Sequence, residues 1–333
     1  MSANGPTSPS AMRCAVLGAG TMGAQIALSL ALGGCQVILW ARRATSLDAA
    51  RGRIQDALDF LVAQDLVDAK NCEGITARVR LQANLLRAVA DADFLIEAVA
   101  EDLAVKRELL ARAQALAPAH AIVSSTTSAL SASALASDLA APERFCIAHY
   151  AQPAHLVALV EVVPGRETTP ATTQAVTALL TRTGKSPVLC PDIPGFLWAR
   201  IQHVVLRELV ALVEAGLVTP QDCDTILKKG YASRLPAMGA FEHADLAGLD
   251  LITSEGAKAV WEDLSNARDP AQTLLGRMVE KGHTGMNAGQ GFYDWRARDA
   301  NAFKAARDAE IVRRAKIDAG AKTTFTDPPP DKT

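Results

Sequence analysis

The sequence predicts an α/β fold, with a doubly wound, mostly parallel sheet in the N-terminal part of the chain and an all-α domain after it. Three observations lead to this prediction. Short apolar runs alternate with amphipathic helical segments as far as Cys190, the pattern of a sheet with helices on both faces. A glycine-rich turn joins the first apolar run to the first helix. Beyond Cys190 the apolar residues follow helical spacing only. With 333 residues, the chain is long enough for two domains.

The first strand and helix are predicted at residues 14–17 and 24–32, and the turn between them has the pattern G-x-G-x-x-G. This spacing makes a tight turn, lets the backbone approach a pyrophosphate and lets the helix pack closely on the strand. Another apolar run follows at residues 36–40. The segment therefore predicts a dinucleotide site of the Rossmann type, with the phosphates at the helix N-terminus. The residues expected to bind the cofactor here are Gly18, Gly20, Thr21, Met22 and Gly23.

The residues after the second strand bear on the choice of cofactor. A carboxylate usually stands there and binds the 2′-hydroxyl of NAD, but this chain has Ala41, followed by Arg42 and Arg43. Guanidinium groups bind phosphate bidentately. We therefore predict NADP as the cofactor, with NAD possible. The alternative is that the two arginines are a solvated pair at the start of the next helix, expected at residues 48–66.

Polar residues follow two later strands. Residues 94–99 predict a strand, and Ala98 and Glu101 lie at its carboxyl end, where open α/β sheets bind ligands. We expect both residues to contact the cofactor; the alternative is that the acidic residues cap the following helix. The next strand continues into five hydroxyl side chains at residues 124–128. We expect at least one of them to contact the substrate, and the alternative is N-capping of a short helix.

Two further strands, at residues 144–150 and 156–163, carry a histidine and a carboxylate. Glu161 stands alone in an apolar run, and a lone buried carboxylate is costly unless it is paired. His149, at the end of the preceding strand, is the nearest candidate partner. Such a pair fixes the imidazole tautomer and raises its basicity. We expect it to remove a hydroxyl proton while hydride leaves the same carbon; the alternative is a structural hydrogen bond.

The domain organisation is read from the same pattern. A helix at residues 172–183 and a strand at 186–190 end the first domain, and the Pro- and Gly-containing segment that follows is the expected hinge. A long apolar helix at 196–215 is too apolar to stand exposed, so we expect a homodimer through the helical domain. The expected parts are 1–11, a disordered lead; 12–190, the Rossmann domain; 191–320, the helical substrate and dimerisation domain; and 321–333, a disordered tail.

Composition excludes several classes of function. The formal net charge is −2, which gives no reason to expect nucleic acid or an acidic membrane as a partner. No apolar run is long enough to span a membrane, and the start lacks the apolar core of a signal peptide. The six cysteines are scattered and the histidines lack metal-ligand spacing. We expect a cytoplasmic protein with reduced thiols and no metal site.

Together, these segments resemble the 3-hydroxyacyl-CoA dehydrogenase family, which includes 3-hydroxybutyryl-CoA dehydrogenases. The resemblance covers nearly everything from Arg13 to about Arg296. It implies a Rossmann domain followed by a helical dimerisation domain, with His149 as general base, Glu161 as its partner and Ser128 as the hydroxyl that binds the substrate oxygen. The motifs that carry it are GAGTMG at 18–23, EAVAE at 97–101, the Ser-Thr segment with His149, LVEVV at 159–163, PGF at 194–196 with Arg200, ADLAGLD at 244–250 and GQGFYDW at 289–295.

Three positions depart from the family pattern. Ala199 replaces the Asn of the family's GF-x-x-N-R, Gln152 replaces the Asn of its HFFNP, and Ala41 replaces the acid after the second strand. Gln152 keeps the amide group, whereas Ala199 removes a polar group that meets the substrate. Ser128, Gln152 and Ala199 are the positions expected to contact substrate.

The resemblance implies a small-molecule hydroxyacyl substrate and a place in fatty acid metabolism: oxidation of a 3-hydroxyacyl-CoA, such as 3-hydroxybutyryl-CoA, to the 3-oxo compound, or the reverse. Two alternatives stay open. The Ala199 change favours a dehydrogenase of a non-CoA hydroxy acid, as in the family's carnitine and gulonate dehydrogenases. The other is a non-catalytic, crystallin-like nucleotide-binding protein, against which the intact His149, Glu161 and Ser128 argue.

Overall fold

The computed structural model describes residues 12–320, so the lead and tail predicted at 1–11 and 321–333 lie outside the described residues. Eight strands form one sheet in the order β3-β2-β1-β4-β5-β6-β7-β8. Neighbouring strands are parallel except for the β6–β7 pair, which confirms the predicted mostly parallel sheet. The strands are β1 (Arg13–Leu17), β2 (Gln36–Trp40), β3 (Val79–Gln82), β4 (Phe94–Glu97), β5 (Ile122–Ser125), β6 (Phe145–Tyr150), β7 (Leu159–Pro164) and β8 (Ser186–Leu189).

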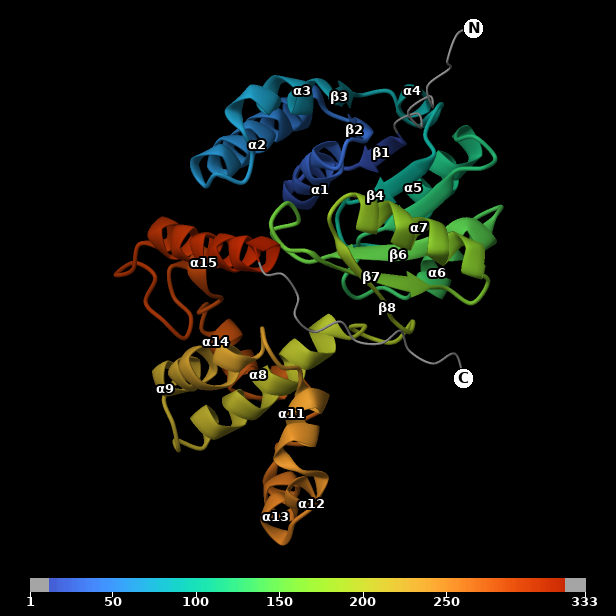
Figure 1. Cartoon of the computed structure of the whole chain (residues 1–333). Coiled ribbons are helices and arrows are strands. Elements are labelled where there is room, and N and C mark those ends of the chain that lie inside the picture. The colour runs from blue at the N-terminus through green and yellow to red at the C-terminus, as the bar shows by residue number, and fades with distance from the viewer. Residues whose placement is uncertain (1–11, 321–333) are drawn as a thin grey trace, which may run out of the picture. The chain divides into compact units, whose positions relative to one another are not determined.

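Helices cover both faces of the sheet (Figure 1). They are α1 (Thr21–Leu32), α2 (Ala44–Ala63), α3 (Cys72–Ala77), α4 (Leu85–Val89), α5 (Leu103–Leu116), α6 (Ala132–Ala136) and α7 (Pro170–Arg182). One core joins the sheet to α1, α2, α3 and α7, and a second joins it to α4, α5 and α6. Strand β1 contributes Val16 to the first core and Leu17 to the second, because successive side chains of a strand point to opposite faces.

The second compact unit, Arg200–Ala306, is built from helices, which confirms the predicted all-α domain. Residues from Arg307 onward belong to the first unit. The last helix therefore begins in one unit and ends in the other. The helices are α8 (Trp198–Glu214), α9 (Pro220–Ile226), α10 (Ala232–Arg234), α11 (Ala240–Ala247), α12 (Leu249–Ile252), α13 (Glu255–Asp263), α14 (Leu274–Glu280) and α15 (Ala300–Gly320).

The first unit runs past the expected hinge to Ala199. Asp192 ties this segment to the start of α6, because its carboxylate accepts four hydrogen bonds of 2.8–3.0 Å from backbone amides and hydroxyls of Ser131–Ser133. Burial acts to raise the pKa of Asp192, but these hydrogen bonds outweigh it and lower the pKa. The segment that leads into α8 is thus fixed on the first unit before the helical unit begins.

Several element boundaries differ from those expected. Helix α2 begins at Ala44 because the preceding Arg43 is extended and acts as the N-cap. Helix α8 begins at Trp198 because Gly195 and Phe196 have φ values of 76° and 47°, which no helix accommodates. Strand β3 and helix α15 were not expected. Strand β3 has only four residues, and α15 lies beyond the motifs that define the family resemblance.

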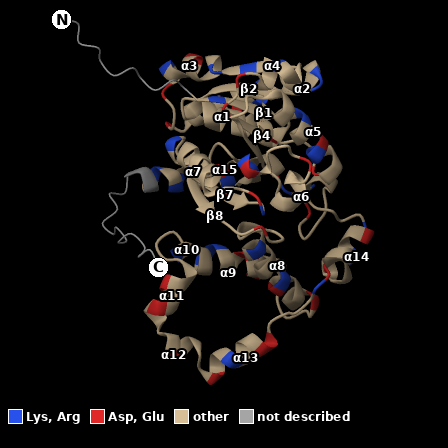
Figure 2. Cartoon of the chain, turned by 90° about the vertical axis from the view of Figure 1, so that its right-hand side faces the viewer, with Lys and Arg blue, Asp and Glu red and all other residues tan. Residues whose placement is uncertain are grey.

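No helix in the described range is long and apolar enough to cross a membrane. Residues 12–320 also contain no group of three or more His, Cys, Asp and Glu side chains that could hold a metal ion. Basic and acidic residues are interspersed over both units (Figure 2).

Candidate active site

The glycine-rich turn connects β1 to α1 where the sequence predicts it. Gly18 has a φ of 126°, and a Cβ there would lie 2.4 Å from the carbonyl oxygen of Ala98. A Cβ at Gly23 would lie 1.8 Å from the carbonyl oxygen of Gly18, so both positions require glycine. A Cβ at Gly20 would meet no protein atom within 4 Å. Gly20 is the N-cap of α1 and no side chain caps that end, which leaves amide groups available to an anion.

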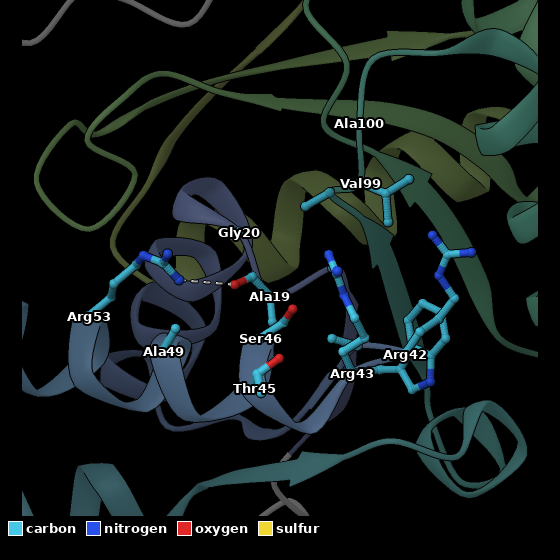
Figure 3. Close-up of a pocket in the computed structure, with 14 residues that line it drawn as sticks. Ala19, Gly20, Arg42, Arg43, Thr45, Ser46, Ala49, Arg53, Val99 and Ala100 are labelled. Carbon is cyan, nitrogen blue, oxygen red and sulfur yellow. Dashed lines mark hydrogen bonds between the residues drawn. The ribbon is translucent and has the colours of Figure 1, made fainter. Parts of the chain in front are cut away.

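A cavity of about 500 Å³ lies beside this turn (Figure 3). It is bounded by the glycine turn, the end of β2, the first turns of α2 and the segment after β4. The lining residues are Gly18, Ala19, Gly20, Trp40, Ala41, Arg42, Arg43, Thr45, Ser46, Ala49, Arg53, Ala98, Val99 and Ala100. These include arginines and no carboxylate, so the residues present fit an anionic dinucleotide whose phosphates lie at the N-terminus of α1.

The structure brings together only some of the expected cofactor residues. Thr21 and Met22 lie in the first turn of α1, next to the cavity-lining Gly20, and Gly23 packs under the turn. Glu101 does not line the cavity.

Sequence reasoning missed part of the cavity wall on α2. Thr45, Ala49 and Arg53 are spaced four residues apart and so share one helix face. Arg53 also donates a hydrogen bond of 3.3 Å to the carbonyl oxygen of Ala19 in the glycine turn. The signal was present in the sequence, because the helix after the second strand of such a site begins beside the cofactor.

Arg42 and Arg43 are exposed, and in Figure 3 both side chains extend from the end of β2 toward the segment that holds Val99 and Ala100. No carboxylate in the described part of the chain pairs with either guanidinium group. Helix α2 has no side-chain cap and no acidic residue in its first turn. This end of the cavity is therefore electropositive.

His149 and Glu161 lie directly opposite each other in the antiparallel β6–β7 pair. The Nδ1 atom of His149 is 2.7 Å from Oε2 of Glu161, and both side chains are buried, with 7% and 2% of their surface exposed. Because an ionised carboxylate only accepts hydrogen bonds, the imidazole donates from Nδ1. In the neutral imidazole, Nε2 is then the acceptor.

Glu161 receives more hydrogen bonds than the histidine alone provides. Its Oε1 atom accepts the backbone amides of Leu197 and Trp198, each at 2.8 Å, and lies 3.5 Å from the Cys190 thiol. Burial acts to raise the pKa of Glu161, but the hydrogen bonds from His149 and the two amides outweigh it and lower the pKa. The pKa of Cys190 is raised to about 12 by burial and by the nearby carboxylate. Glu161 therefore stays ionised beside a neutral thiol.

Ser128 completes a line of three side chains. Its hydroxyl lies 2.9 Å from Nε2 of His149, and since Nε2 is the acceptor, Ser128 donates. The Phe196 ring packs beside the imidazole at a centroid distance of 5.6 Å. The arrangement offers a base at Nε2 and a hydroxyl beside it, both at the carboxyl ends of strands of the sheet.

The hydroxyl segment that holds Ser128 is supported by a buried ion network. Lys106, with 1% of its side chain exposed, contacts Glu97 at 2.9 Å and Glu101 at 3.1 Å. Glu101 in turn accepts hydrogen bonds from the Thr127 hydroxyl and, at 3.2 Å, from the Ser128 amide. Burial acts to raise the pKa of Glu101, but these bonds and the Lys106 charge lower it.

The alternative roles considered for Glu101 and the five hydroxyls were helix caps, and neighbouring residues fill these roles instead. Asp102, and not Glu101, caps α5 by accepting the Val105 amide at 2.9 Å. Ser131 caps α6, so the five hydroxyls at 124–128 are not needed for that purpose.

Comparison with known proteins assigns the family. Residues 13–193 match the 3-hydroxyacyl-CoA dehydrogenase NAD-binding domain, and residues 195–295 match the C-terminal domain of the same family. The chain belongs to the 3-hydroxyacyl-CoA dehydrogenase family. It is an oxidoreductase with an NAD-binding Rossmann domain.

Relatives within the family are named for different substrates. A 5-formyl-3-hydroxy-2-methylpyridine 4-carboxylate 5-dehydrogenase of Mesorhizobium japonicum is 31% identical over 307 residues, which are 91% of this chain and 97% of the relative. A probable 3-hydroxybutyryl-CoA dehydrogenase of Deinococcus radiodurans is 32% identical over 285 residues, which are 85% of this chain and 100% of the relative.

Solved structures show the same two types. The crystal structure of a 5-formyl-3-hydroxy-2-methylpyridine 4-carboxylic acid 5-dehydrogenase, described as an NAD⁺-dependent dismutase, has a TM-score of 0.85 and 29% identity, and covers 94% of this chain and 100% of its own. The (S)-3-hydroxybutyryl-CoA dehydrogenase of Ralstonia eutropha has a TM-score of 0.71 and 27% identity, and covers 86% of this chain and 99% of its own.

Gln152 and Ala199 are the two expected substrate positions that depart from the family pattern, and they lie far apart in the sequence. Gln152 is exposed on the connection between β6 and β7. Ala199 is half-buried in the first turn of α8, beside Trp198, whose amide binds Glu161. In the described residues, the Gln152 side chain is not hydrogen-bonded to His149 or Glu161, and the methyl group of Ala199 has no hydrogen-bonding atom.

Replacing Glu161 with Gln tests whether the carboxylate is held ionised. Because its pKa is lowered from an ordinary 4.5, the ionised form contributes stability above that pH, and the contribution is lost as the pH falls through the lowered value. We expect the melting temperature of Glu161→Gln to be lower than that of the wild type at neutral pH. The difference in melting temperature should narrow as the pH falls below 4.5.

Scanning calorimetry from about pH 3 to pH 7 measures this gap. Glu108→Gln, at an exposed residue of α5, is the control and should show little gap at any pH. A gap for Glu161→Gln that stays constant across the range would contradict an ionised, stabilising Glu161.

Proposed function

We propose that this protein transfers hydride between a nicotinamide dinucleotide and the carbinol carbon of a small carboxylic acid, with His149 as general base. The observation that carries the proposal is the line of contacts from Ser128 to His149 to Glu161, at 2.9 and 2.7 Å. The nicotinamide dinucleotide, when bound, supplies the hydride acceptor or donor. The protein's own side chains supply the proton transfer.

The proton steps follow from which ring nitrogen of His149 binds Glu161 and which one accepts a proton. In oxidation, the substrate hydroxyl donates its proton to Nε2 of His149 while the Ser128 hydroxyl hydrogen-bonds the oxygen that becomes a carbonyl. The imidazolium that forms is stabilised by the Glu161 carboxylate 2.7 Å from Nδ1. Reduction reverses each step, so the imidazolium returns the proton to the alkoxide oxygen. Acid–base catalysis of this kind contributes about 10²–10⁴-fold.

A small acid is favoured over a CoA thioester by the charges on α2. A CoA tail is polyanionic and needs a basic groove, and this part of the chain offers Arg51 and Arg53 on α2 and Lys70 beyond the end of that helix. Arg53 is bound to the glycine turn and Lys70 to Asp68 at 2.7 Å, which leaves Arg51 as the basic side chain among these three that has no bonded partner in the described residues. Ala199, where the family has Asn, and the TM-score of 0.85 with a pyridine-carboxylate dehydrogenase support the same choice.

A 3-hydroxyacyl-CoA is the second candidate substrate. It is supported by the match of both family domains over residues 13–295 and by relatives named 3-hydroxybutyryl-CoA dehydrogenase that align over their whole length. It needs the same proton chemistry at His149, so the two candidates differ only in the group attached to the reacting carbon.

We further propose NADP(H) as the preferred dinucleotide. Ala41 removes the carboxylate that would bind a 2′-hydroxyl, and Arg42, Arg43, Thr45 and Ser46 line that end of the cavity. The uncapped N-terminus of α2 lies there as well. Guanidinium groups, hydroxyls and helix amides are the groups that bind a phosphate. The family's domain is described as NAD-binding, so this preference is a property proposed for this chain.

A homodimer through the helical unit is proposed from its exposed apolar residues. Phe241, Leu246 and Trp261 are 90%, 75% and 73% exposed, and large apolar residues gathered on one unit are typical of an interaction surface. They lie on α11 and α13.

His149→Gln should cut kcat by about 10²–10⁴-fold and leave the affinity for the reduced dinucleotide within about twofold. The amide cannot take the substrate proton, whereas the cofactor cavity does not include this residue. Stopped-flow kinetics and cofactor fluorescence measure the two effects. His120→Gln, at an exposed histidine, is the control. A variant that kept more than about a third of wild-type turnover would place the base elsewhere.

Ala199→Asn separates the two substrate candidates. In an enzyme for a small acid, the added amide crowds the pocket and lowers kcat/KM for the native acid. In a CoA-type enzyme it restores the family residue and raises or preserves activity with 3-hydroxybutyryl-CoA. The assay compares a panel of hydroxy and formyl carboxylic acids with CoA thioesters at 340 nm. Highest wild-type activity with a thioester would refute the small-acid proposal.

NADPH should bind at least about tenfold more tightly than NADH at low salt, because a charge-assisted hydrogen bond contributes about 1.5–3 kcal/mol. Part of this difference in affinity should be lost as the salt concentration rises. Ala41→Asp with Arg42→Ala should reverse the order of affinities, while Arg51→Ala, on α2 but outside the cavity, should not. Fluorescence titration of both cofactors tests this, and equal affinities in the wild type would contradict it.

Light scattering after size-exclusion chromatography should give a mass twice the 35.1 kDa of one chain. Phe241→Asp with Leu246→Asp should reduce the measured mass to that of the monomer, because burying two unpaired charges in an interface is strongly unfavourable. Leu86→Asp, at a 51% exposed residue of the first unit, should leave the dimer intact. A monomeric wild type would refute the proposed dimer.

A further inference from the structure

The helical unit contains a pocket of about 180 Å³ beside α8. Its apolar wall comes from Leu206, Val210 and Leu275. Three basic side chains also line it: His203, Arg207 and Arg268. His203 and Arg207 are one helical turn apart on α8, and Arg268 comes from the segment between α13 and α14.

These three basic side chains have no carboxylate partner within the described range. None of them takes part in an ion pair there, although acidic residues lie close by in the sequence. Glu208 accepts the Ser265 amide at 2.7 Å, and Asp269 accepts the Ala271 amide at 2.9 Å and the Gln272 side chain at 3.0 Å. Glu208 and Asp269 therefore bind groups of the segment between α13 and α14 and not the three basic side chains.

The remaining acid of this part of α8 is also occupied. Glu214 binds Arg277 at 2.6 Å and the Leu274 amide at 3.1 Å. A fold that gathers unpaired basic side chains around an apolar hollow, while the neighbouring acids bind other groups, presents a site for an anion with an apolar body.

We propose that this pocket binds the carboxylate of a small organic acid, with Arg207 and Arg268 on the carboxylate and the apolar part of the acid against Leu206, Val210 and Leu275. Arg207 and Arg268 donate to the two carboxylate oxygens, as guanidinium groups do in planar pairs. The volume of about 180 Å³ suits an acid the size of benzoate.

All the residues that line the pocket belong to the second unit. The ligand is therefore a free carboxylic acid, and its binding here does not rest on the proposed function.

The test is isothermal titration of the full-length protein with benzoate and, separately, with inorganic phosphate. We expect saturable benzoate binding that weakens at least about tenfold in Arg207→Gln with Arg268→Gln, since two charge-assisted hydrogen bonds are lost. Arg234→Gln, at an exposed basic residue of the same unit outside the pocket, should change it by less than about twofold. Phosphate should bind more weakly than benzoate, because it makes no use of the apolar wall.

Unchanged benzoate affinity in the double variant, or no saturable binding in the wild type, would overturn the proposal. Equal binding of phosphate and benzoate would overturn the role of the apolar wall. Circular dichroism and melting temperature of the unliganded variants establish that they are folded.

A kinetic control uses the same double variant. Because the acid bound in this pocket is not the substrate, KM for the best substrate should stay within about threefold of the wild-type value, and a KM raised at least tenfold would overturn a free acid as the ligand. Absence of turnover with every substrate would reject the proposed function and leave the binding result standing.

Discussion

The Glu161 carboxylate is the group on which the rest of the site depends. It accepts a hydrogen bond from His149 on the neighbouring strand, two from the amides of Leu197 and Trp198, and lies beside the Cys190 thiol. These donors come from β6, from the end of β8 and from the start of α8. A single buried charge thus joins the strand that carries the base to the segment that leads into the helical unit. Without it, the imidazole would lose both its fixed tautomer and its counter-charge.

Sheet topology explains why the reacting groups meet. Strands β4, β5 and β6 are parallel neighbours, so their carboxyl ends lie at one edge of the sheet. Strand β7 returns antiparallel, and its register sets Glu161 opposite His149. The buried Lys106 and its two carboxylates then hold the Ser128 segment against β4. The base, its counter-ion and the hydroxyl are therefore held by elements with well-packed cores, which keeps them in place before substrate binds.

Much of this could be predicted from the sequence, and the reasons are specific. A lone carboxylate in an apolar strand predicted a partner, and the glycine spacing predicted the cofactor turn. The amide contacts to Glu161 could not be predicted, because they depend on the backbone reversal at Gly195 and Phe196. Nor could the burial of Lys106, since a lysine on an amphipathic helix normally faces solvent. The pocket beside α8 depends on Arg268, which lies 61 positions beyond Arg207 in the sequence.

The most direct test of the account is ¹⁵N NMR of the His149 side chain at neutral pH, in the wild type and in Ser128→Ala. The predicted result is a ring protonated at Nδ1, with Nε2 as the nitrogen whose shift changes when the Ser128 hydroxyl is removed. A ring protonated at Nε2 instead, with Nδ1 as the acceptor, would contradict it. In that state Glu161 could not be an ionised acceptor, and His149 would have no basic nitrogen directed at Ser128 or at a substrate hydroxyl.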